Sequence, residues 1–237
     1  MVSASDVLKI NCIIMVKVIS ILLVLISLPV FGQQNDTLKF NNLKLGLSIS
    51  PSFSSRYLNA ESDAQANAEY FDSIEIPHLG YSLGLNLGYQ FSKRFSINSG
   101  LFFANRAQSS KSVSLESISN FTNNIYYLDL PLKFNYYFLS KKSKLYLTGG
   151  ANFSYFLANK LSYRKEGNTE LFSAKADNLN TINIAGILGI GIDVPIYKRW
   201  AFNFEVNYQH AFTPLLNTPI KRYLFSFNPT ISLFYRF

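Results

Sequence analysis

The chain has 237 residues and one cysteine, a length that suits a single domain once a targeting segment is removed. Its formal net charge is +8, but the basic residues lie mainly in the turns and loops between apolar stretches, as at Lys93-Arg94 and Lys198-Arg199. Nucleic-acid binding needs positive charge gathered on one face among exposed aromatic residues, so this distribution argues against it.

The first 32 residues resemble an export signal. Lys17 precedes an apolar run from Val18 to Phe31, which is shorter than the roughly 20 residues of a membrane-spanning helix. We therefore predict a secretory signal peptide over residues 1–32, with Met15 as a candidate natural start, followed by a short periplasmic segment, 33–42. Because Cys12 precedes the cleavage site, the mature chain has no disulfide and no lipid-bearing cysteine.

From residue 43 onward, large apolar residues alternate with Gly, Ser, Asn and other polar residues. Between Leu79 and Phe91 every odd position is apolar and every even position is small or polar. A period of two predicts a β-strand with one apolar and one polar face. The pattern predicts eight strands, at residues 43–54, 79–91, 95–106, 126–138, 144–157, 181–194, 200–212 and 224–237.

The connections between these strands alternate between short and long. About three to five residues join strands two to three, four to five, and six to seven, whereas the long connections are residues 55–78, 107–125, 158–180 and 213–223. All short turns then lie at one end. This arrangement is typical of an all-β, eight-stranded antiparallel up-and-down transmembrane barrel, here residues 43–237, with short turns and both termini in the periplasm.

A soluble eight-stranded barrel would show the same alternation with its apolar face inward. The interior of such a small barrel barely holds its own side chains, so inward residues should be small. Here the polar face is small, as at Gly84 and Gly88, and the apolar face is bulky, as at Phe134 and Phe204. The bulky face is therefore predicted to meet lipid, with aromatic residues near both interfaces. Pro131 and Pro229 lack the N–H of a paired strand and are expected to mark bulges.

Three segments resemble the PorT-like outer-membrane β-barrel domain family of Gram-negative bacteria. They are residues 127–134 (YLDLPLKF), residues 186–193 (GILGIGID) and the C-terminal ISLFYRF. The final alternation of Leu233, Tyr235 and Phe237 is similar to the signal that the barrel-assembly machinery recognises in its substrates. The resemblance spans residues 40–237. It implies an outer-membrane barrel, and the family's namesake implies an accessory role in protein secretion and gliding.

Charged residues on the inward face are the first candidates for a functional site, because charge at membrane depth is costly and usually paired. Counted from the short turns, they form three groups: Lys133 with Glu205, Arg106 with Asp129, and Lys44 with Asp193 and Arg236. They could line an ion path or form a salt-bridge network that fills the interior. We favour the filled interior, because small barrels are normally packed.

No catalytic, cofactor or metal site is expected. His78 and His210 are the only histidines, no Gly-x-Ser-x-Gly signature occurs, and the acidic residues of the first long loop are unpatterned. We therefore expect a non-enzymatic, monomeric structural or interaction protein that acts through its external loops. The alternatives are a PorT-type accessory component of a secretion or gliding apparatus, a narrow passive channel, and a lipid-modifying enzyme. Expected partners are outer-membrane lipid, the barrel-assembly machinery, and outer-membrane or secretion-apparatus proteins.

Overall fold

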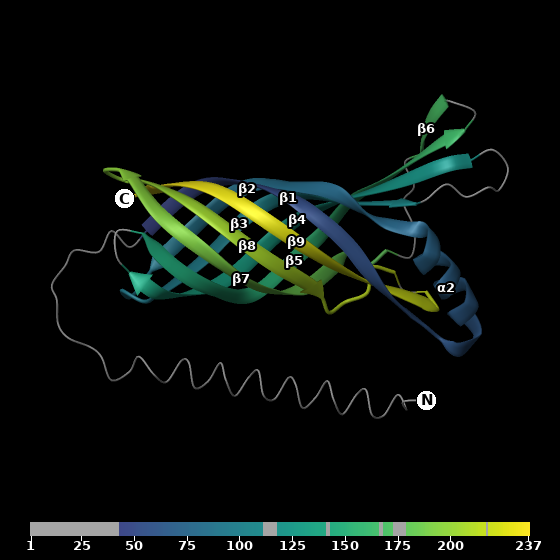
Figure 1. The fold of residues 1–237 in the computed structure, drawn as a ribbon, viewed down its shortest axis with the longest axis horizontal. Coiled ribbons are helices and arrows are strands. Elements are labelled where there is room, and N and C mark those ends of the chain that lie inside the picture. The colour runs from purple at the N-terminus through teal and green to yellow at the C-terminus, as the bar shows by residue number, and fades with distance from the viewer. Residues whose placement is uncertain (1–42, 111–117, 141–142, 166–167, 173–178, 217) are drawn as a thin grey trace. The chain divides into compact units, whose positions relative to one another are not determined.

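The computed structural model describes residues 43–110, 118–140, 143–165, 168–172, 179–216 and 218–237 (Figure 1). The predicted signal peptide and the segment 33–42 lie outside the described residues. Nine strands and one α-helix are defined in the described part. The strands are β1 (Leu43–Ala60), β2 (Glu75–Gln90), β3 (Phe95–Ser110), β4 (Ile118–Ser140), β5 (Lys144–Lys165), β6 (Asn168–Phe172), β7 (Ile182–Tyr197), β8 (Trp200–Ala211) and β9 (Ile220–Arg236).

Eight of these strands close into a ring. Each strand pairs antiparallel with its neighbours in the order β4-β3-β2-β1-β9-β8-β7-β5, and the pairing of β4 with β5 completes the circle. The last strand, β9, lies along the first, from Lys44 opposite Arg236 to Ala60 opposite Ile220. The predicted eight-stranded barrel is confirmed. The remaining strand, β6, lies outside this ring, and among the described residues it pairs with the outer part of β5 alone.

The turns β2–β3, β4–β5 and β7–β8 lie at one end of the barrel, here called the turn end, together with the C-terminus. The opposite, loop end carries α2 (Gln65–Ile74) and β6, as Figure 1 shows. Four strands begin at the predicted residues Leu43, Phe95, Lys144 and Trp200, all near the turn end.

Towards the loop end, six of the predicted strands stop too early, whereas those that correspond to β7 and β8 agree within one residue. The region 55–78, expected to be a loop, contains the last residues of β1, a short 3-10 helix (Ser62–Ala64), α2 and the start of β2. The region 158–180 likewise contains the end of β5 and all of β6. Beyond the membrane the outward face no longer needs to be apolar, so the two-residue pattern fades while backbone pairing continues.

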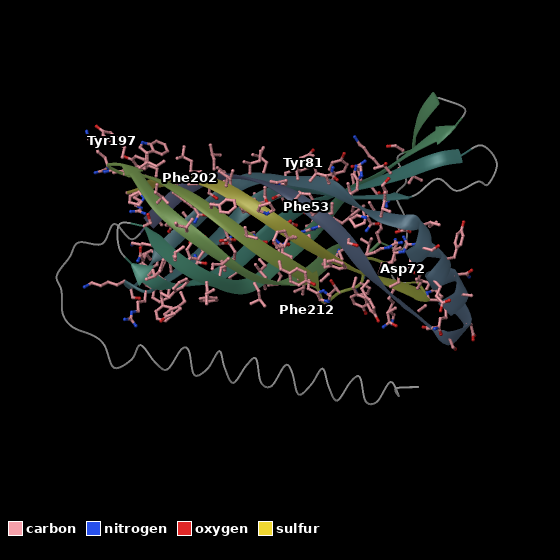
Figure 2. The ribbon with its side chains drawn as sticks, viewed as in Figure 1. Phe53, Asp72, Tyr81, Tyr197, Phe202 and Phe212 are labelled. Atoms are coloured by element: carbon pink, nitrogen blue, oxygen red, sulfur yellow. The ribbon has the colours of Figure 1, made fainter. Side chains whose placement is uncertain are left out.

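The two faces of the wall differ as predicted. Leu85 is 53% exposed and Phe204 is 39% exposed on the outside, whereas Ser50 is 2% and Asn152 is 1% exposed on the inside. The alternative of a soluble barrel with an apolar interior is therefore wrong. Figure 2 shows the side chains that cover the wall, with Tyr197 near the turn end and Asp72 on α2 at the loop end.

Outward aromatic rings form contacts across neighbouring strands near both ends of the barrel wall. Near the turn end, Phe95 lies 5.3 Å from Tyr136 and Trp200 lies 5.2 Å from Tyr235, measured between ring centroids. Nearer the loop end, Phe103 stacks on Tyr126 at 5.6 Å. Amphipathic rings at headgroup depth form such rows in membrane barrels.

The prolines expected to mark bulges do not do so. Pro131 stays in register opposite Asn152, and Pro229 stays in register opposite Val206. The hydroxyl groups of Ser99 and Ser50 each donate a hydrogen bond of 2.9 Å to the carbonyl oxygen of Pro131 and Pro229, respectively. The neighbouring strand therefore bonds each proline carbonyl through a side chain, and the register passes both prolines without an extra residue. Register shifts occur instead beside Pro77 and Pro195.

Candidate functional site

The centre of the lumen is crossed by an ion pair between Lys133 of β4 and Glu205 of β8. The Lys133 Nζ lies 2.7 Å from Glu205 Oε1, and the side chains are 8% and 2% exposed. The hydroxyl of Tyr146 donates to Glu205 Oε2 at 2.9 Å, and the Asn207 amide donates to Oε1 at 3.1 Å. A buried carboxylate is stable only when its oxygens are bonded in this way.

A second group of polar residues continues this network towards the turn end. The Asn203 amide donates to the hydroxyl of Tyr146 at 2.7 Å and to Asp193 Oδ1 at 2.6 Å. Asp193 Oδ2 accepts hydrogen bonds from Lys44 Nζ at 3.2 Å and from the Tyr137 hydroxyl at 2.9 Å. One continuous set of hydrogen bonds therefore runs from Lys133 to Lys44.

The third member of the predicted Lys44 group behaves differently. Arg236 lies opposite Lys44 in the ladder between β1 and β9, and its backbone N–H donates to the carbonyl of Arg199 at 2.8 Å. Within the described residues Arg236 forms no ion pair, so it lies beside Lys44 in the ladder but takes no part in the Lys44–Asp193 pair. The C-terminal residues Leu233 and Phe237 are exposed, and Tyr235 packs between the rings of Trp200 and Phe237.

Large rings, which were not predicted from the sequence, also fill the turn-end half of the lumen. Tyr137, Tyr146 and Phe234 are at most 2% exposed. Two of these rings need a glycine beside them, because a Cβ on Gly191 would lie 2.4 Å from the Tyr146 ring and one on Gly46 would lie 2.6 Å from the Phe234 ring. The signal was present in the sequence, since Tyr146 occupies an inward position of its strand.

Nearer the loop end, Arg106 of β3 pairs with Asp129 of β4. The Arg106 Nη2 lies 2.6 Å from Asp129 Oδ2, and its Nη1 donates to the Ser154 hydroxyl at 3.4 Å. The guanidinium lies 4.7 Å from the centroid of the Tyr127 ring, within the range of a cation–π contact. The predicted pair is thus present. Asp129, Ser154 and the Tyr127 ring together hold the Arg106 guanidinium in one orientation.

Above Arg106, the loop end of the lumen is apolar. Ile125, Tyr127, Leu215 and Leu224 are buried in one cluster with three alanines, and the partly buried Phe156, Leu179 and Leu216 pack against them. Leu215 comes from the β8–β9 loop rather than from a strand. Periodicity gives no information in a loop, so this layer was not predicted.

A further charged layer lies where β1, β2 and β9 extend at the loop end. Glu75, the first residue of β2, forms ion pairs with Arg56 of β1 and Arg222 of β9. The side chains of Arg56 and Glu75 are less than a tenth exposed. These contacts attach the end of α2 to the barrel rim.

The histidines lie outside the lumen. His78 is exposed on β2, and the ring of His210 stacks on Tyr208, with Nδ1 lying 3.3 Å from the tyrosine hydroxyl. Across the described ranges, no three His, Cys, Asp or Glu residues are grouped so as to hold a metal ion. None of the helices in the same ranges is long and apolar enough to cross a membrane.

A family model described as outer membrane protein beta-barrel domain matches residues 31–217, well over half of the chain. The chain belongs to this family. It is therefore a bacterial outer-membrane protein, and its apolar outer wall is the surface that meets lipid. This match does not assign the chain to the narrower PorT-like family. No curated relative matches the chain.

Solved structures of small outer-membrane barrels are similar to this outer-membrane protein at low identity. Neisserial surface protein A has 12% identity and a TM-score of 0.44, over 82% of this chain and 97% of that one. OprG from Pseudomonas aeruginosa has 14% identity and a TM-score of 0.45, over 83% and 97%. The outer membrane protease OmpT from Escherichia coli has 8% identity and a TM-score of 0.45, over 87% and 100%. These similarities assign no activity to the chain.

Proposed function

We propose that this outer-membrane protein is a monomeric, non-enzymatic interaction protein whose lumen is closed and whose loop end supplies the contacts. The observation that carries the proposal is the folded extension at that end, where β4 and β5 remain paired out to Ile118 and Lys165 and β6 adds a further strand. Ordered backbone pairing beyond the wall offers a fixed surface, which an unstructured loop would not.

Placing the loop end outside the cell and both termini in the periplasm follows the general arrangement of such barrels, with short turns periplasmic and long loops external. In that orientation the extension faces the surroundings of the cell, and lipid surrounds the wall. The C-terminal residues Leu233, Tyr235 and Phe237 would serve the barrel-assembly machinery during insertion.

The absence of an enzymatic role is supported by the environment of the two histidines. His210 bonds Tyr208 on the lipid side, and His78 is on another strand, exposed. A Ser-His-carboxylate triad needs all three groups within hydrogen-bond reach. The ion pairs Arg106–Asp129 and Lys133–Glu205 lie within the lumen, beneath the apolar cluster.

Affinity capture from intact outer membranes tests the interaction role. A variant in which residues 161–172 are replaced by a short Gly-Ser turn is expected to lose the partners that the full chain captures, because β6 and the end of β5 are removed. The variant Arg94→Ser, changed at the turn end, is the matched control and should capture them all. If both variants capture the same proteins, the extension is not the contact surface.

A PorT-type accessory role in secretion or gliding is the second candidate, favoured by the sequence YLDLPLKF at residues 127–134. A deletion strain would then fail to release exported proteins into the medium, and the full chain would restore release. Normal secretion and gliding in the deletion strain would exclude this role.

The closed lumen predicts the result of a conductance measurement. In planar bilayers the purified protein is expected to give no stepwise currents, because ion pairs cross the lumen at two levels and the apolar cluster closes its loop end. Hydrophobic constrictions block ions by excluding water.

A matched preparation of Glu205→Ala should differ from the wild type far more in melting temperature than in current. Steady ohmic conduction by the wild-type protein would contradict a closed lumen and favour the passive channel.

A further inference from the structure

A cavity of about 50 Å³ lies within the lumen between its two central ion pairs. Its lining includes Arg106 and Asp129 of one pair, Lys133 of the other, and the polar residues Asn152, Asn207 and Asn228. All six side chains belong to residues that are at most 8% exposed. The cavity is therefore enclosed by barrel strands, and apolar residues such as Phe102 and Ile187 complete its lining beside these polar groups.

Among the residues that the structure describes, two acceptor atoms of the cavity lining have no hydrogen-bond partner. Asp129 Oδ2 bonds Arg106, but Asp129 Oδ1 is buried without a donor, and so is the side-chain carbonyl oxygen of Asn152. An unsatisfied buried acceptor costs about 1–3 kcal/mol, so both oxygens favour a guest that brings hydrogen-bond donors.

The charges around the cavity restrict which kind of small molecule can bind in it. Arg106 is neutralised by Asp129, and Lys133 is neutralised by Glu205. An added anion would find both cations already paired, and an added cation would lie beside Arg106 and Lys133. A neutral donor is favoured. Since one water occupies about 10–15 Å³ of such a cavity, the space suits about three or four waters or one small polar molecule.

The cavity lies on a path towards the loop end. A second cavity of about 20 Å³ shares Arg106 and Gln209 with the first, and its other lining residues include Tyr127, Ala211 and Leu224 of the apolar cluster. Leu215, 2% exposed, belongs to the same cluster. In the other direction, Lys133 and Glu205 separate the cavity from the Asp193 network.

Leu215 is held in place by its backbone. Its N–H donates to the carbonyl of Arg222 at 2.6 Å, and its carbonyl accepts from the Asn180 N–H at 3.1 Å. The Asn180 side-chain amide also donates to the Pro214 carbonyl at 2.7 Å. The loop thus bonds both to β9 and to the residues before β7, and it carries its leucine into the mouth of the lumen.

We propose that the part of the lumen between the Lys133–Glu205 pair and Leu215 is a chamber that binds small neutral hydrogen-bond donors, water first among them. In this proposal, the Leu215 side chain closes the chamber towards the exterior. The chamber supplies Asp129 Oδ1 and Asn152 Oδ1 as acceptors. The proposal is independent of which partner binds at the loop end.

The accessibility of an introduced cysteine tests whether Leu215 closes the chamber. In a Cys12→Ser background, Asn228→Cys places one thiol in the chamber, and a small water-soluble methanethiosulfonate is added to the folded protein in liposomes. Adding Leu215→Ala is expected to raise the labelling rate by about tenfold or more, because the cost of opening the apolar cluster falls with the buried area of residue 215. Leu215→Val should give an intermediate rate, and it preserves the test if the alanine variant folds poorly.

The matched control is Ser96→Cys, on the other side of the Lys133–Glu205 pair, where Ser96 donates to the Tyr137 hydroxyl at 3.3 Å. Its labelling rate should be the same whether Leu215 is intact or replaced through Leu215→Ala. Fast labelling of Asn228→Cys with Leu215 intact would show that nothing closes the chamber. Equal, slow labelling with Leu215→Ala would show that the barrier lies elsewhere. Either result overturns the proposal.

Discussion

The substitution Glu205→Ala is expected to destabilise the folded barrel by about 3–5 kcal/mol, the usual cost of removing one partner from a buried ion pair. The ammonium group of Lys133 would remain in the lumen without its counter-charge. The hydroxyl of Tyr146 and the amide of Asn207 would also lose the acceptor they share. Urea unfolding in detergent micelles, followed by tryptophan fluorescence and by the heat-dependent gel mobility typical of membrane barrels, measures the loss.

The double substitution Lys133→Met with Glu205→Gln is the control for this prediction. It removes both charges while keeping a polar group for Tyr146, so it should be more stable than Glu205→Ala alone. Two outcomes would contradict the proposed role of the pair: an alanine variant as stable as the wild type, or a double variant no better than the single one.

A second large effect is expected at Gly150, which faces inward on β5. A Cβ there would lie 2.0 Å from the carbonyl oxygen of Leu132 and 2.9 Å from the Lys133 Cα, both backbone atoms of β4. Because backbone cannot rotate away as a side chain can, Gly150→Ala must separate the two strands. We expect a loss of about 1–3 kcal/mol, typical of overpacking, or a failure to close the barrel.

The adjacent glycine provides the matched comparison. A Cβ on Gly149 would have ordinary contacts, the nearest at 3.7 Å from a methyl group of Leu188. Gly149→Ala should therefore change the free energy of unfolding by less than about 1 kcal/mol in either direction. Equal effects of the two substitutions would mean that the strand approach at Gly150 is not the constraint it is taken to be.

The wall of the barrel could be predicted because its physical cause repeats every two residues. Between Leu79 and Phe91 each odd side chain meets lipid and each even one faces the interior, so the sequence records the orientation directly. The pairing of Lys133 with Glu205 followed from counting along strands from the short turns, since a strand has a constant rise per residue.

The features that could not be predicted from the sequence do not follow a repeating pattern of residues. Glu75 meets Arg56 only because α2 and a short 3-10 helix turn the chain back between them. Leu215 is one of two adjacent leucines in a loop, and neither strand phase nor charge distinguishes which of them closes the lumen. The inward tyrosines were not predicted because interior residues were expected to be mostly small, whereas Gly191 makes room for one large ring.

The positions of the three ion pairs Arg106–Asp129, Lys133–Glu205 and Lys44–Asp193 bear on how the barrel is assembled. Arg106 and Asp129 lie on adjacent strands, so this contact can form in an open sheet. Lys133 reaches Glu205 past β5 and β7, and Lys44 reaches Asp193 past β9 and β8, so both contacts require a curved wall. Until the sheet curves far enough to bring these partners together, the four charged side chains of the two pairs stay hydrated or lack a counter-charge. Insertion should therefore be cooperative, with the final seam between β1 and β9 sealing late.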